Sequence, residues 1–103
     1  MSYDERQIRA IIEYIEDIGE PQERWPKKEF EMVAYSKWAA DTILTEALAH
    51  PDMTPVRVVE EFKYKMSKLI HIHPEYPEVQ LIFQSAYDTA TDIGDILIAM
   101  LPY

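Results

Sequence analysis

Apolar residues recur along the chain at intervals of three and four, and prolines interrupt this pattern at four places. Such spacing is typical of an α-helix that buries one face. Proline disrupts a helix interior and disfavours helical geometry in the residue before it, so each proline-containing stretch predicts a break. The pattern therefore predicts four helices, over about residues 3–18, 26–50, 55–73 and 77–100.

Residues with helix-capping preferences flank the predicted helices. Thr54 followed by Pro55 is typical of a helix start, and Gly19 is typical of a C-terminal cap. Ser2 and Glu5 have the S-x-x-E spacing of a capping box. These local signals predict where the helices begin and end.

The predicted helices alternate short, long, short, long, and the connections between them are short. Short connections favour antiparallel neighbours. We therefore predict an all-α four-helix bundle of two antiparallel helical hairpins, in a single domain of residues 1–103. The second helix is apolar over most of its girth, including Trp38 and Leu48, which predicts a central position.

Small residues in the fourth predicted helix lie at intervals of four: Ala86, Ala90 and Gly94. This spacing either forms a shallow groove that another helix approaches closely or marks ordinary core positions.

The composition narrows the classes of partner and location. The chain has no cysteine, its formal charge is −9, and no Lys or Arg follows Lys68. A negative chain repels phosphate backbones and anionic membrane surfaces, so we expect no direct nucleic-acid or membrane partner. The N-terminal residues are polar and no apolar run approaches bilayer length, which favours a cytoplasmic protein.

Two histidines, His71 and His73, precede a proline stretch that also contains Glu75. A helical metal pair needs a spacing of three or four, whereas a spacing of two points the rings about 200° apart. A histidine–glutamate metal site is therefore the weaker interpretation. The stronger one is a hinge between the two helical hairpins.

Asp88, Asp92 and Asp95 lie on one face of the fourth predicted helix. Like charges at a spacing of four are locally unfavourable, so the helix itself does not call for this arrangement. The face either binds a divalent cation, binds a partner, or is an ordinary solvated face opposite the core.

Two short stretches resemble the metal-binding motifs of MazG-type nucleotide pyrophosphohydrolases. The stretch 92–101 (DIGDILIAML) is similar to the second motif, and the stretch 58–66 (VVEEFKYKM) is similar to the first. The resemblance implies a magnesium-dependent hydrolase built from helices. The chain departs from it at Tyr64, where the family has a third glutamate, and at Asp92, which replaces a glutamate. A degenerate enzyme of this type, with magnesium as its cofactor, is thus the alternative function.

A longer part of the chain resembles a group of small, acidic, uncharacterised proteins of Gram-positive bacteria, their phages and mobile elements. The shared features are a W-A-x-D helix, an H-P…T-P turn and a V-E-E-F helix within residues 34–62, and an A-x-D-T-A helix within 81–97. The resemblance implies a phage or mobile-element context and brings no activity with it.

The C-terminal residues are apolar on more sides than a single face buried in the core of the chain can cover. Ile98 and Leu101 fall outside that buried face, so another surface must shield them from water. Aromatic residues also lie in proline loops or at the terminus: Trp25, Tyr76 and Tyr103. Aromatic and aliphatic residues in such places are typical of interfaces, often with a second copy of the chain.

No catalytic motif stands beside these features. We therefore predict a non-enzymatic interaction or regulatory protein without a cofactor. It binds a protein partner, is a homodimer, and in one version is an anti-defence inhibitor that presents its acidic face to a basic surface.

Overall fold

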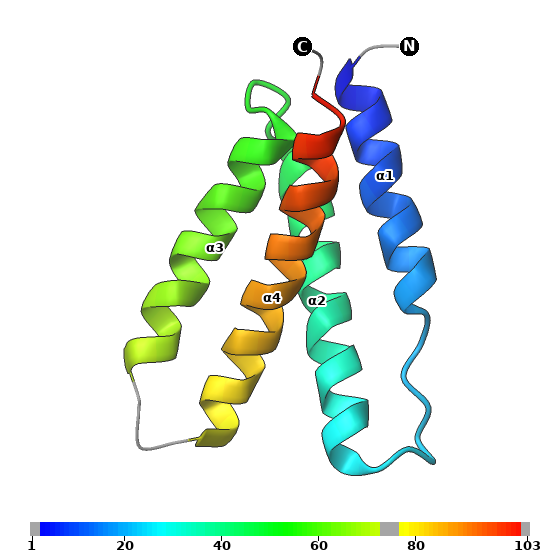
Figure 1. The fold of residues 1–103 in the computed structure, drawn as a ribbon, viewed down its shortest axis with the longest axis vertical. Coiled ribbons are helices and arrows are strands. Elements are labelled where there is room, and N and C mark those ends of the chain that lie inside the picture. The colour runs from blue at the N-terminus through cyan, green and yellow to red at the C-terminus, as the bar shows by residue number, and fades with distance from the viewer. Residues whose placement is uncertain (1–2, 73–76, 102–103) are drawn as a thin grey trace.

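Four helices form over the segments that the apolar periodicity predicts (Figure 1). The computed structural model describes residues 3–72 and 77–101. The helices are α1 (Tyr3–Ile18), α2 (Lys27–Ala49), α3 (Pro55–Ile72) and α4 (Pro77–Ala99), and the described residues contain no strand. Each bound lies within one residue of its predicted position, so the all-α prediction is confirmed.

Local capping chemistry explains two of these bounds. Gly19 follows α1 with a φ of 70°, a left-handed conformation that glycine adopts without steric cost, and its N–H donates to the Ile15 carbonyl at 3.3 Å. The Thr54 hydroxyl accepts a hydrogen bond from the Arg57 N–H at 3.2 Å, so Thr54 caps α3 as predicted. Ser2, of the predicted capping box, lies outside the described residues.

Consecutive helices run antiparallel, which makes two helical hairpins, α1–α2 and α3–α4 (Figure 1). The two hairpins meet mainly through α2 and α4, which run in the same direction. Helix α4 packs most extensively against α3 and α2, whereas α2 and α3 contact each other much less. The bundle therefore has an open side between α2 and α3.

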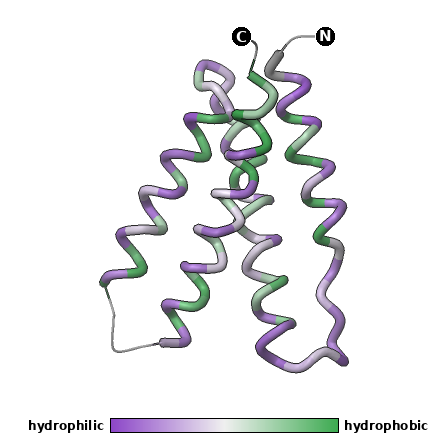
Figure 2. Tube along the Cα trace, in the orientation of Figure 1, coloured by the Kyte–Doolittle hydropathy of each residue, from purple (hydrophilic) through white to green (hydrophobic). Residues whose placement is uncertain are grey.

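Buried apolar residues from all four helices form one core, as the alternation of apolar and hydrophilic positions along each helix requires (Figure 2). Helix α4 rather than α2 provides the largest buried face, with seven buried residues against four. The reason is that α4 lies between α3 and α2 and is covered on two sides. Among the described residues, no helix combines the length and the apolarity that crossing a bilayer requires.

The small residues of α4 do lie where another helix approaches closely. Ala86 and Ala90 are fully buried, and a Cβ atom added at Gly94 would meet Val59 Cγ1 of α3 at 3.2 Å. Helix α3 therefore approaches α4 closely at Gly94, whereas the burial of Ala86 and Ala90 fits either interpretation of the spacing.

Three residues of the predicted apolar stripes are exposed instead. Leu48 is 61% exposed, Trp38 is 45% exposed, and Ile12 of α1 is 39% exposed. Leu48 lies in the last turn of α2 beside a hollow that separates it from α1, and Trp38 faces the open side between α2 and α3. The prediction that α2 is apolar because it is central is wrong for these positions.

Candidate functional site

The acidic residues predicted as a partner-binding face lie on the surface of α4. Asp88, Asp92 and Asp95 are all exposed. Asp88 Oδ1 accepts a hydrogen bond from Gln84 Nε2 at 2.9 Å, and Asp92 Oδ2 accepts one from the Tyr14 hydroxyl of α1 at 3.3 Å. Asp92 therefore also ties α4 to α1, which the spacing of the acids alone does not indicate.

Tyr14 is held in its neutral form at this contact. Partial burial of the phenol raises its pKa above the ordinary value, and the neighbouring Asp92 carboxylate raises that pKa further. The neutral hydroxyl is the form that donates to Asp92, so the contact persists through the neutral pH range.

A hollow of about 380 Å³ separates α1, α2 and α4 beside these acids. Asp88 and Asp92 lie at its edge, and Ile18, Met32 and Val33 supply its apolar part. An aliphatic stem with a cationic end, as in lysine or arginine, matches an apolar hollow beside carboxylates.

Two of the acids in the stretches that resemble the MazG-type motifs contact other side chains. Glu61 lies 3.6 Å from Arg57 as an exposed ion pair, and Asp92 accepts from Tyr14. Among residues 3–72 and 77–101, no three His, Asp or Glu side chains come close enough together to hold a metal ion.

The histidines do not converge in the part of the chain that is described. His50 Nε2 lies 3.2 Å from Glu46 Oε2, one turn earlier in α2, and His71 is exposed in the last turn of α3. His73 and Glu75 lie outside the described residues, and so does the predicted hinge of which they are part.

The predicted apolar contacts are only partly described. Ile98 is 46% exposed and Leu101 is 37% exposed, while Trp25 is partly buried beside Phe30. Tyr76 and Tyr103 lie outside the described residues.

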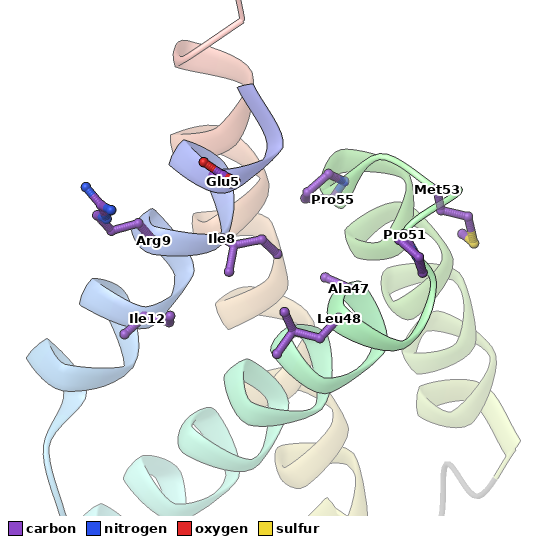
Figure 3. Close-up of a pocket in the computed structure, with 9 residues that line it drawn as sticks. All are labelled: Glu5, Ile8, Arg9, Ile12, Ala47, Leu48, Pro51, Met53 and Pro55. Atoms are coloured by element: carbon purple, nitrogen blue, oxygen red, sulfur yellow. The ribbon is translucent and has the colours of Figure 1, made fainter. Parts of the chain in front are cut away.

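An apolar groove that the sequence did not indicate opens between α1, the C-terminal end of α2 and the segment that leads into α3. This α1–α2 groove has a volume of about 400 Å³. In Figure 3, the side chains of Ile8 on α1 and Leu48 on α2 point into the gap between the two helices. The lining comprises seven apolar residues and two charged ones: Glu5, Ile8, Arg9, Ile12, Ala47, Leu48, Pro51, Met53 and Pro55.

No single sequence pattern could have identified this groove, because its lining comes from a helix, a helix end and a loop. The one signal was Leu48, an apolar residue one position before the end of a helix and followed by a loop that contains Pro51.

A second hollow, of about 370 Å³, lies on the open side between α2 and α3 and is here named the α2–α3 furrow. Trp38 borders it, with its ring centroid 5.9 Å from that of Phe62. The furrow is lined by Trp38, Thr42, Ile43, Glu46, His50, Met53, Val58, Glu61, Phe62, Lys65 and Met66.

Comparison of the chain with protein-family models, with curated proteins and with solved structures finds no match. The function is therefore inferred from the surfaces described above.

Proposed function

We propose that the protein is a non-enzymatic interaction protein that binds an amphipathic helix of a partner protein in the α1–α2 groove, with basic residues on the polar side of that helix. The observation that carries the proposal is the groove itself, whose side chain Leu48 is 61% exposed to water.

The groove suits the apolar side of a helix. Ile8 and Ile12 lie one turn apart on α1 and line one wall, and Leu48 lies on the other wall (Figure 3). A bound helix places side chains from successive turns into such a groove, and burying them releases water from both surfaces.

The charge of the chain favours a basic partner. The formal charge is −9, and α4 has Glu78, Asp88, Asp92 and Asp95 but no Lys or Arg. A negative field of this kind steers a positively charged partner toward the protein and raises its association rate, most strongly at low salt.

Two further parts of the proposal rest on the sequence. The resemblance of residues 34–62 and 81–97 supports a phage or mobile-element origin, in which the basic partner is a host defence protein that the acidic face inhibits. The sequence prediction of a homodimer is kept, and the large apolar side chains left exposed, among them Trp38, Ile98 and Leu101, support it.

The magnesium-dependent hydrolase is not the function proposed here. Two of the acids that the motif resemblance would assign to the metal, Glu61 and Asp92, contact Arg57 and Tyr14.

A groove variant with a matched control tests the proposal. The probe is a synthetic amphipathic helical peptide of leucine and lysine, and its binding is measured by fluorescence anisotropy. Leu48→Glu should weaken binding at least about tenfold, because a carboxylate in an apolar groove must be desolvated by the bound helix. Tyr64→Glu, at a residue of similar exposure (64%) on α3, adds the same charge outside the groove and should leave binding unchanged.

Because both variants make the chain more acidic, loss of binding to the basic peptide cannot come from charge alone. Equal affinity of Leu48→Glu and the parent protein would refute the groove as the binding site. Circular dichroism spectra of both variants check that the helices are intact.

A further inference from the structure

The α2–α3 furrow has a buried apolar floor and a half-exposed tryptophan at its edge. Ile43 is fully buried, Val58 and Met66 are each 5% exposed, and Phe62 is 7% exposed. Trp38, at 45% exposure, contacts Phe62 with the rings tilted by 54°. A large aromatic side chain that is continuous with an apolar furrow is the type of residue that anchors protein interfaces.

The charged residues along the furrow have both signs. Glu46 and Glu61 line it together with Lys65 and His50. Among the described residues, Lys65 forms no ion pair within 4.0 Å, whereas Glu61 pairs with Arg57 and Glu46 with His50. Lys65 is thus the cation of the furrow that is open to a partner.

Helix α3 is also the one described helix in which bases outnumber acids: Arg57, Lys63, Lys65 and Lys68 against Glu60 and Glu61. Two copies of a chain with a charge of −9 repel each other over most of their surface. The furrow and α3 form the region where this repulsion is weakest.

The opposite charges lie toward opposite ends of the furrow. Glu46 lies two turns beyond Trp38 along α2, and Lys65 lies one turn beyond Phe62 along α3. Because α2 and α3 run antiparallel (Figure 1), Glu46 and Lys65 lie on opposite sides of the Trp38–Phe62 contact along the furrow. A two-fold axis that crosses the middle of the furrow at right angles to its length exchanges its ends, so it places the Lys65 end of one copy on the Glu46 end of the other.

We propose that a second copy of the chain binds in the α2–α3 furrow, related by a two-fold axis. Trp38 of each copy inserts into the furrow of the other, and Lys65 of each copy pairs with Glu46 of the other. This inference rests on the dimer in the proposed function and assigns the surface that forms it.

The apolar end of α4 is a less suitable dimer surface. Asp95 lies one turn before Ile98 on a helix without a base, so a two-fold contact through Ile98 brings two Asp95 carboxylates toward each other. Like charges that face each other across an interface cost affinity, whereas the furrow pairs unlike ones.

The test measures the mass of the intact protein by sedimentation equilibrium over a range of concentrations. The parent chain should show twice its monomer mass of 12.1 kDa. Lys65→Glu and Glu46→Lys should each weaken the dimer at least about tenfold, since each places like charges opposite one another. The double variant Glu46→Lys/Lys65→Glu restores unlike pairs and should recover the affinity of the parent protein.

A pair of tryptophan variants tests the anchor. Trp38→Ala should weaken the dimer at least about tenfold, whereas Trp25→Ala, which lies outside the furrow, should not. Circular dichroism checks the fold of Trp38→Ala. If that variant unfolds, the variants at Glu46 and Lys65 still test the dimer surface, because both of these residues are exposed.

A parent protein that stays at monomer mass at high concentration would overturn the inference. So would a dimer that Ile98→Glu dissociates and Lys65→Glu leaves intact, or a double variant that fails to recover. The two proposals fail separately. Unchanged peptide binding in Leu48→Glu refutes the groove whatever the mass of the protein, and an unchanged dimer in Lys65→Glu refutes the furrow whatever its peptide binding.

Discussion

Replacing Gly94 by alanine tests how closely α3 and α4 pack. Gly94 is buried in α4, and the added Cβ would lie 3.2 Å from Val59 Cγ1. This distance is shorter than an ordinary van der Waals contact between carbon atoms. Val59 is fully buried and β-branched, so it is restricted to one rotamer in its helix and cannot turn away.

Two opposing terms set the size of the effect. Alanine is favoured over glycine in a helix interior by about 1 kcal/mol. Forcing an extra methyl group into a packed core costs about 1–3 kcal/mol. We therefore expect Gly94→Ala to lower the free energy of unfolding by about 1 kcal/mol, against the trend for this substitution in helices.

Truncating the opposing side chain should reverse the sign. In a Val59→Ala background, the space left by the missing methyl groups accepts the new Cβ. There, Gly94→Ala should raise the free energy of unfolding by about 1 kcal/mol, which makes the coupling energy of the pair about 2 kcal/mol. The assay is urea unfolding of the four proteins of this cycle, followed by circular dichroism at one protein concentration.

Two results would refute this reasoning. If Gly94→Ala stabilises the parent protein by about 1 kcal/mol, α3 does not approach α4 closely at this point. If the effect is the same with valine and with alanine at position 59, the two residues are not in contact.

Three further predictions concern contacts between and within helices. Gln7 is fully buried and its side-chain N–H donates to the Leu97 carbonyl at 3.4 Å, so Gln7→Glu should destabilise the fold by about 3 kcal/mol at pH 7. Burial raises the pKa of a carboxyl there, so the loss should shrink as the pH falls; urea unfolding at two pH values checks this, and a pH-independent loss would contradict it. Asp92→Asn should lower the raised pKa of Tyr14 without returning it to its ordinary value, because burial remains the larger cause. The tyrosinate absorbance, with Tyr14→Phe as the reference, measures this pKa, and an unchanged value would exclude the contact. The stability that neutral Tyr14 contributes is fully present below the pKa of an unfolded tyrosine and is lost as the pH rises through the higher, folded value. Thr54→Ala removes the cap of α3 and should cost about 1 kcal/mol in thermal unfolding, while Thr54→Ser should cost little.

The helix bounds could be predicted because they depend on local chemistry. A proline, a capping threonine at Thr54 and a left-handed glycine at Gly19 act within one turn of the chain, wherever the helix later packs. The exposure of Asp88, Asp92 and Asp95 followed in the same way, from their position opposite the apolar stripe of α4.

The candidate surfaces could not be predicted in this way, because they depend on which helices become neighbours. Trp38 and Leu48 have the spacing of core residues, yet they are exposed because α2 stands apart from α3 at Trp38 and from α1 at Leu48. Gln7 reads as a polar surface residue, yet it is buried against the end of α4, 90 positions away in sequence. Neither the α1–α2 groove nor the α2–α3 furrow has a signature in consecutive residues.

The sequence by itself thus determined that the chain forms four helices, where each begins and ends, and that its charge is acidic toward the C-terminus. The tertiary structure alone decided that α4 packs between α3 and α2, that Asp92 contacts Tyr14, and that α2 and α3 leave a furrow open between them. The physical reason is the distance along the chain over which each interaction acts. Capping and periodicity act within a helix, whereas the cover of an apolar face depends on helices that are distant in sequence and reach it only when the bundle assembles.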